Sequence, residues 1–342
     1  MSVDKIALDD SRISHCEAVL NGQRYHYILG IPEHQAFSAT IFLIHGWPDL
    51  SYGWRYQIPF LIQQNMRVVV PDMMGYGRTV SGPQDAPQSP PADLHLYSIK
   101  RAADDIAELA KQLGAPEIIL GGHDWGGAVV YRTAQWYPKL VTHLFSICTP
   151  YTAPSRQFIS LKQMVDGPLP QFGYQIQLSE PGLENDLKAY DQIRRFLQAV
   201  YGGRSERGRS CFRPDIGLDF EAMKTIGTAP SLSGQELNHY TSEYMRHGLH
   251  GPLNWYRTRL INFEDDLKLG TKMVKQPVLF ITGKLDEVLK PAMSTGMENF
   301  IPQLRKEEVE TGHWALTEAP AEVNKCIGSW LKEIVCKSSV KL

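Results

Sequence analysis

Short apolar runs alternate with amphipathic stretches along most of the chain. Five runs rich in Ile, Val, Leu and Phe are bounded by Gly, Pro or Asp, as buried strands usually are: TIFLIHG, RVVVPD, EIILGGHD, LFSICTP and PVLFITG. Helical patterns lie between them. The clearest is SIKRAADDIAELAKQLG, in which Ser98 can cap the start and Gly114 can end the helix. Strands that alternate with helices predict an α/β fold, with a mostly parallel sheet and helices on both faces.

The pattern changes after about residue 150. No strand-like run follows until QPVLFITG, and helical stretches such as DLKAYDQIRRFLQAVYG and GQELNHYTSEYMRHGL take the place of strands. We therefore expect a helical cap, or lid, inserted into one α/β core. Residues 1–150 are predicted to form the first part of the core, residues 151–256 the cap, and residues 257–342 the second part of the core. The stretch SGPQDAPQSPPAD predicts a surface loop.

Composition and charge narrow the class of protein. The 342 residues are 43% hydrophobic and 21% charged, which is enough apolar mass for a full core. The formal net charge is -2 and no long basic run occurs, so nucleic acid is not an expected partner. No run approaches the roughly 18 apolar residues that a membrane-spanning helix needs, so we expect no membrane span.

The cysteines and the two ends of the chain bear on its compartment. The cysteines have no CxxC spacing, which argues against a disulfide framework or a zinc site and favours a reducing compartment: Cys16, Cys148, Cys211, Cys326 and Cys336. The start, MSVDKIALDD, lacks the apolar segment of a signal peptide, and we expect a cytoplasmic protein. The final Val-Lys-Leu is similar to the peroxisomal Ser-Lys-Leu signal, so a peroxisomal location is the alternative.

The segment ILGGHDWGGAVV has the Gly-x-nucleophile-x-Gly spacing of a strand-to-helix turn, with Asp124 where serine hydrolases carry Ser. A carboxylate needs no base to become charged, because its unperturbed pKa is about 3.9. It can displace a leaving group at an sp3 carbon and so form an ester with the substrate. The neighbouring His123 should point away from Asp124 and pack or form hydrogen bonds. An ester at Asp124 then requires a second step, in which activated water hydrolyses it.

Other motifs supply groups for that second step. His313 in VETGHWALTEAP can activate water, and Asp286 in LFITGKLDEV follows a predicted strand and can orient the histidine. The tetrahedral intermediate needs two backbone N–H donors. Trp125 directly follows the nucleophile, and Trp47 lies in the loop FLIHGWPD. A cis Trp47–Pro48 bond is one way in which Pro48 could stiffen that loop.

Taken together, HGWPDLSYGWRYQIPFL, VVPDMMGYGRT and GGHDWGG resemble the core motifs of the α/β-hydrolase epoxide hydrolases of the soluble and fungal type. The resemblance covers nearly the whole chain. It implies an α/β-hydrolase fold with Asp124 as nucleophile, His313 and Asp286 as the base pair, and the amides of Trp47 and Trp125 as oxyanion donors. It implies no cofactor and no metal, and its substrates are an epoxide, expected here to be small and hydrophobic, and water.

Two further stretches resemble the tyrosine motifs of that family's cap. FGYQIQLSEPG implies Tyr174 and GPLNWYRTR implies Tyr256 as the pair that binds and protonates the epoxide oxygen. Spacing alone does not select them, because the chain has 15 tyrosines and Tyr151 and Tyr244 are equally good candidates. Two alternative functions remain at this point. One is a haloalkane dehalogenase, which also uses an Asp nucleophile, and the other is a ligand receptor on an inactive hydrolase fold.

Overall fold

The computed structural model describes residues 3–33, 37–79 and 92–339. The Val-Lys-Leu ending and all but the last two residues of the predicted Pro-rich loop lie outside the described residues, as does the side chain of Cys336. Within the described ranges, no helix combines the length and the apolar composition that crossing a bilayer requires.

An eight-stranded sheet runs through the molecule in the order β1-β2-β4-β3-β5-β6-β9-β10. Strands β1, β2 and β4 pair antiparallel and all other neighbours pair parallel, so the predicted mostly parallel sheet is confirmed. The strands are β1 (Ile13–Leu20), β2 (Gln23–Gly30), β3 (Ala39–Ile44), β4 (Met66–Pro71), β5 (Ile118–His123), β6 (Val141–Ile147), β9 (Val278–Gly283) and β10 (Leu304–Val309).

The five predicted apolar runs form β3, β4, β5, β6 and β9, whose side chains are mostly or fully buried on both faces. The edge strands β1 and β10 were not predicted, because exposed positions interrupt their apolar ones and remove the continuous run. Strand β2 was missed for a related reason: three of its buried positions are Tyr25, His26 and Tyr27 in place of aliphatic residues.

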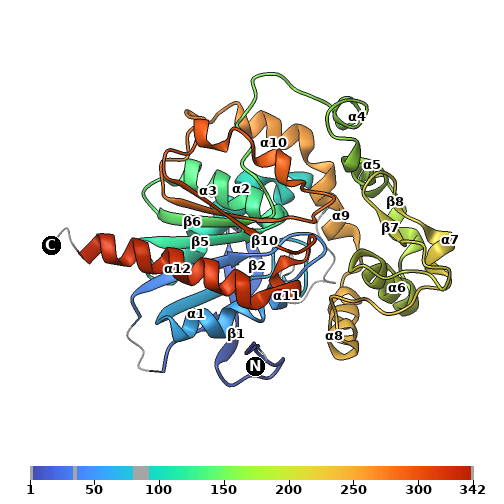
Figure 1. The fold of residues 1–342 in the computed structure, drawn as a ribbon, viewed down its shortest axis with the longest axis horizontal. Coiled ribbons are helices and arrows are strands. Elements are labelled where there is room, and N and C mark those ends of the chain that lie inside the picture. Colours follow the sequence, from blue (N-terminus) through green and yellow to red (C-terminus); the bar gives the residue numbers. More distant parts are fainter. Residues whose placement is uncertain (1–2, 34–36, 80–91, 340–342) are drawn as a thin grey trace.

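Helices cover both faces of the sheet, as predicted (Figure 1). Helices α2, α3 and α10 pack together on one side, and α1, α11 and α12 on the other. Their bounds are α1 (Gln57–Gln63), α2 (Ile99–Gln112), α3 (Trp125–Trp136), α10 (Arg259–Asp266), α11 (Ala315–Glu318) and α12 (Pro320–Ser339). Helix α2 begins where the sequence places it, since the Ser98 hydroxyl accepts a hydrogen bond from the N–H of Arg101 at 3.1 Å.

The chain between β6 and α10 lies beyond one end of the sheet (Figure 1). Its helices are α4 (Leu161–Val165), α5 (Tyr174–Ser179), α6 (Tyr190–Val200), α7 (Phe220–Met223), α8 (Gly234–Tyr244) and α9 (His250–Arg257). It also holds an antiparallel pair that the sequence analysis did not predict, β7 (Phe212–Arg213) with β8 (Gly217–Leu218). Two residues per strand are too few to produce a periodic apolar pattern.

Single turns of 3-10 helix complete the fold at Ser51–Trp54, Leu94–Tyr97, Pro170–Phe172, Leu183–Asp186, Pro291–Ser294 and Met297–Asn299. The loops that follow β3, β5, β9 and β10 leave the same edge of the sheet, because these strands run parallel. In open α/β sheets this edge is where ligands bind. The arrangement therefore gathers Trp47, Asp124, Asp286 and His313 from four separate loops.

We predict that Ser98→Ala lowers the free energy of unfolding by about 1 kcal/mol, because the N–H of Arg101 loses its acceptor. Urea unfolding followed by circular dichroism measures the change. Ser98→Gly is the matched control. It removes more volume from the same buried position, yet glycine costs a helix N-cap only a few tenths of a kcal/mol. A larger loss in the glycine variant than in the alanine variant would assign the effect to packing instead of capping.

Candidate active site

Asp124 stands on a tight turn between β5 and α3. Its backbone has φ 53° and ψ -124°, a conformation that side-chain-bearing residues rarely adopt. The flanking glycines make the turn possible. A Cβ on Gly126 would lie 2.0 Å from the main-chain oxygen of Ile44, and one on Gly122 would lie 2.3 Å from that of Gly126. The turn presents the Asp124 side chain at the edge of the sheet.

The loop after β3 reaches the Asp124 carboxylate. The N–H of Trp47 donates to Asp124 Oδ1 at 2.7 Å, and the N–H of Trp125 also bonds this carboxylate. Burial raises the pKa of Asp124, while the charge of His313 and these two N–H donors act against that rise. The Trp47–Pro48 bond is cis, as the sequence analysis considered. Both amides named from the sequence thus point at the same carboxylate.

His313 lies between two carboxylates. Its Nδ1 is 2.8 Å from Asp286 Oδ2, and its Nε2 is 3.6 Å from Asp124 Oδ2. Asp286 is fixed in turn, because its Oδ1 accepts the N–H groups of Val288 and Leu289 at 2.8 and 2.9 Å. Burial opposes the charged form of the imidazole, but the charges of Asp286 and Asp124 prevail and raise the pKa of His313 to about 9.

The same contacts act on Asp286. Burial alone would raise its pKa, yet the nearby His313 charge and the hydrogen bonds lower it to about 2. At neutral pH the resting site therefore holds the His313 imidazolium against the ionised Asp286, with the buried Asp124 carboxyl on its other side. The Nδ1–H of His313 is committed to Asp286, which leaves Nε2 facing Asp124 and the space beside it.

His123 faces away from the Asp124 side chain, as expected from the turn. Its Nε2 lies 2.8 Å from the main-chain oxygen of His313, to which it donates. Burial lowers the pKa of His123 to about 3, so the ring is neutral. The thiol of Cys148 meets the same oxygen at 3.5 Å. His123 and Cys148 therefore hold the backbone that carries His313.

Within the described ranges, one group of side chains has metal-ligand spacing, formed by His123, Cys148 and His313 with ligand atoms within 4.8 Å of one another. These residues are engaged already, since His123 bonds the His313 backbone and His313 bonds Asp286. Burial and the neighbouring Asp286 raise the pKa of the Cys148 thiol well above its usual range, which disfavours the thiolate that a metal requires. The donor set fits a metal poorly.

Tyr174 and Tyr256 line the same cavity as Asp124. Their rings are 5.9 Å apart and nearly perpendicular, and Tyr256 packs edge-on against Trp47 and Trp125 at 5.3 and 5.5 Å. The hydroxyls form a chain in which the Trp125 indole donates to Tyr256 and Tyr256 donates to Tyr174. Burial and the Asp124 charge raise the pKa of both phenols, so both remain O–H donors.

The other two candidate tyrosines are engaged elsewhere. The Tyr244 hydroxyl donates to the main-chain oxygen of Pro48 at 2.7 Å, and the Tyr151 hydroxyl donates to that of Lys272 at 2.5 Å. Of the four candidate tyrosines named from the sequence, Tyr174 and Tyr256 line the cavity that contains Asp124.

A cavity of about 220 Å³ joins these groups. Its wall is largely apolar and aromatic, and Leu285 and Glu287 are exposed residues of its lining. Sequence reasoning missed most of this wall, because its residues come from separate loops without a shared motif. The wall residues it missed are Ala199, Val200, Gly202, Ser210, Phe212, Pro214, Leu285, Glu287, Val288 and Trp314.

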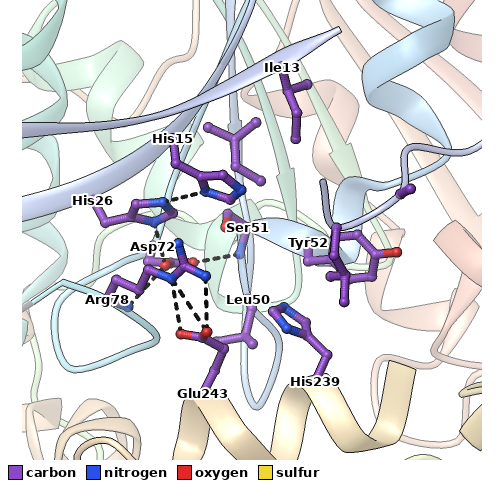
Figure 2. A pocket seen from close by; sticks show the side chains of 13 residues that line it. Ile13, His15, His26, Leu50, Ser51, Tyr52, Asp72, Arg78, His239 and Glu243 are labelled. Atoms are coloured by element: carbon purple, nitrogen blue, oxygen red, sulfur yellow. Dashed lines mark hydrogen bonds and ion pairs between the residues drawn. The ribbon is translucent and has the colours of Figure 1, made fainter. Parts of the chain in front are cut away.

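A second cavity, of about 160 Å³, lies between β1, β2 and α8 (Figure 2). It contains a hydrogen-bonded chain in which His15 meets His26 at 2.8 Å and His26 meets Asp72 at 2.7 Å. Arg78 and Glu243 form an ion pair at its side, as Figure 2 shows. None of the sequence-predicted site residues lines it.

Comparison with known proteins agrees with this geometry. A family model described as the alpha/beta hydrolase fold matches residues 39–187. The chain is 36% identical to epoxide hydrolase srdG of Neurospora crassa over 98% of this chain and 100% of that protein. It is 31% identical to bifunctional epoxide hydrolase 2 of Rattus norvegicus over 93% of this chain, and it spans about half, 55%, of that longer protein.

Solved structures give the same result. The crystal structure of epoxide hydrolase A from Mycobacterium thermoresistibile superposes with a TM-score of 0.77 at 27% identity, covering 94% of this chain and 98% of that one. The predicted α/β-hydrolase fold is thereby confirmed. These relatives favour the epoxide hydrolase prediction over the dehalogenase and receptor alternatives.

We predict that Asp286→Asn lowers the pKa of His313 more than Asp124→Asn does, because the Asp286 oxygen is closer, at 2.8 against 3.6 Å. Both variants should move the pKa of about 9 toward the ordinary value of roughly 6.5. NMR titration of the His313 ring nitrogens measures both shifts. Equal shifts, or a larger one for Asp124→Asn, would contradict this charge arrangement.

Proposed function

Because this chain belongs to the epoxide hydrolases of the α/β-hydrolase fold, we propose that it converts epoxides to vicinal diols through a covalent ester on Asp124. The observation that carries the proposal is the setting of one carboxylate. Asp124 is held by the N–H of Trp47 and faced by His313, with Tyr174 and Tyr256 lining the same cavity. A nucleophile, an acid pair and a base thus converge on one space.

In the first step the carboxylate of Asp124 bonds to an epoxide carbon, and the bond between that carbon and the ring oxygen breaks. The oxygen leaves as an alkoxide, which is a poor leaving group unless it is protonated. Tyr174 and Tyr256 bond the oxygen and one of them transfers its proton, since a phenol is a stronger acid than an alcohol. The products of this step are an alkyl ester, a neighbouring hydroxyl and a tyrosinate.

Ester formation prepares His313 for the second step. The new ester is neutral, so His313 loses one of the two charges that raise its pKa. The proton that the imidazolium then releases restores the tyrosine through solvent. Neutral His313 takes a proton from water, and the hydroxide attacks the ester carbonyl. The N–H groups of Trp47 and Trp125 bond the resulting oxyanion.

Collapse of the tetrahedral intermediate breaks the bond between the carbonyl carbon and the substrate oxygen. The imidazolium of His313 protonates that oxygen, and the diol leaves. Asp124 is then a carboxylic acid with one oxygen from water, and it returns its proton to His313, which restores the carboxylate and the imidazolium. Asp286 stays ionised and holds the imidazole through Nδ1.

The residues of the cavity wall favour a neutral, apolar substrate. Among the described residues, no Lys or Arg lines the cavity, and its carboxylates are Asp124, Asp286 and Glu287. A substrate carboxylate inside it would lose hydration without gaining a free cation, because His313 is already paired with two carboxylates. We therefore include hydrophobic epoxides without a nearby negative charge in the proposed function.

We predict that His313→Gln accumulates the ester, visible as a gain of one substrate mass on the intact protein, because the first step does not need the base. Asp124→Ala should form no adduct and no diol. In wild-type enzyme, a single turnover in heavy-oxygen water should place the label in the peptide that contains Asp124. Label found only in the diol of that first turnover would mean that water attacks the epoxide directly.

We predict that an epoxy methyl ester whose ester group lies within a few carbons of the ring is a better substrate than the corresponding free acid. The ratio of kcat/KM should be about tenfold or more, which corresponds to about 1.4 kcal/mol of unfavourable charge interaction. Glu287→Gln should narrow the ratio. Glu310→Gln is the matched control, because Glu310 pairs with Lys284 outside the cavity lining. Equal rates for acid and ester would contradict the substrate class.

A further inference from the structure

The loop that carries Trp47 accepts hydrogen bonds from three tyrosine hydroxyls. All three tyrosines belong to the segment between β6 and α10. Tyr201 and Tyr240 donate to Asp49 Oδ1 at 3.2 and 2.5 Å, and Tyr244 donates to the main-chain oxygen of Pro48 at 2.7 Å. All three tyrosines are at most 3% exposed. Their acceptors stand one and two positions after Trp47, the residue whose N–H bonds the Asp124 carboxylate.

Asp49, which accepts two of these hydrogen bonds, also bonds the backbone of its own loop. Its Oδ1 also accepts the N–H of Leu50 at 2.8 Å, and its own N–H bonds the main-chain oxygen of Gly46 at 3.0 Å. The second bond closes a turn around Trp47. The other carboxylate oxygen, Oδ2, packs where a Cβ on Gly53 would lie, only 2.0 Å away. The Asp49 side chain thus fixes the loop on both sides of Pro48.

The core fixes the same loop from the opposite side. Asp72 Oδ1 accepts the N–H of Ser51 at 2.9 Å, and His26 holds Asp72 at 2.7 Å. Figure 2 shows Ser51 beside Asp72, and Leu50 near Glu243 of α8. The Tyr52 ring packs edge-on against that of His239, also in α8, at 5.2 Å. Helix α8 is also tied to the core by the buried ion pair of Glu236 with Arg55 at 2.7 Å. The loop is therefore clamped between the sheet and α8.

The tyrosines are suited to remain donors. Burial, and then the charge of Asp49, raise the pKa of Tyr201, Tyr240 and Tyr244 well above the usual range. Their O–H groups therefore stay protonated at neutral pH.

We propose that Tyr240, with Tyr201 and Tyr244, positions the oxyanion hole by holding the Trp47 N–H in place through Asp49 and Pro48. The inference rests on the two-step function proposed above. Its consequence is specific to one step. During ring opening the Asp124 carboxylate loses charge, so a weaker Trp47 contact costs little. During ester hydrolysis full negative charge develops at that oxygen, and a misplaced donor slows the reaction.

The test separates the two steps in Tyr240→Phe and Tyr244→Phe. Rapid quenching followed by mass analysis gives the rate of ester formation, and decay of the isolated ester gives the rate of hydrolysis. We expect hydrolysis to slow about tenfold while ring opening changes less than about twofold. The ester should then accumulate at steady state, and KM should fall together with kcat.

Tyr25→Phe is the matched control. It also removes a buried tyrosine hydroxyl from a carboxylate, that of Asp105 at 2.7 Å, but outside the loop and the cavity. A purely structural role would lower stability in all variants without shifting the balance between steps. Tyr244→Phe keeps the proposal testable if Tyr240→Phe fails to fold. It breaks a bond to the main-chain oxygen of Pro48, whereas Tyr240→Phe leaves the buried Asp49 carboxylate with one donor fewer.

Equal slowing of both steps, unchanged rates, or the same shift in Tyr25→Phe would overturn the inference. Its failure is distinct from failure of the proposed function. If wild-type enzyme forms no ester, the two-step scheme is wrong. If wild type forms and hydrolyses the ester, and Tyr240→Phe and Tyr244→Phe leave the balance unchanged, only the positioning role is wrong.

Discussion

A buried carboxylate with a strained backbone is the constraint on which the rest of the site depends. Asp124 is 8% exposed and adopts a positive φ, so both its charge and its geometry must be compensated by neighbours. Glycines clear the space for the turn, the loop after β3 supplies an N–H, and the loop after β10 supplies an imidazolium. In the proposed mechanism each of these neighbours has a second role, because the groups that contact the Asp124 carboxyl also act on its ester.

Charge balance around His313 links the two steps of the proposed mechanism. His313 lies between the carboxyl groups of Asp124 and Asp286, and in the proposed mechanism alkylation of Asp124 removes one of these two charges. Under that proposal, His313 stays a cation before the ester forms and becomes a base once an ester is present to hydrolyse. The buried, neutral His123 contributes no competing charge and supports only the backbone of His313.

The sequence predicted most of what depends on local pattern. Strands β3, β4, β5, β6 and β9 are continuous apolar runs because both their faces are buried. Asp124 was recognisable from the glycines its turn requires. Tyr174 and Tyr256 were different: only a family resemblance separated them from Tyr151 and Tyr244, and only the fold shows that the latter two have partners elsewhere. The cavity wall and the contacts that hold the Trp47 loop could not be predicted from the sequence, because both arise from contacts between distant segments.

The order of the strands has a consequence for how the enzyme matures during synthesis. The hydrogen bond from His123 to the backbone of His313 joins residues 190 positions apart, and β9 and β10 are added to the sheet last in the chain. On the ribosome Asp124, the proposed nucleophile, is therefore made long before His313, the proposed base. Under the proposed mechanism, a nascent chain cannot hydrolyse the ester until its final strands dock and place His313 beside Asp124.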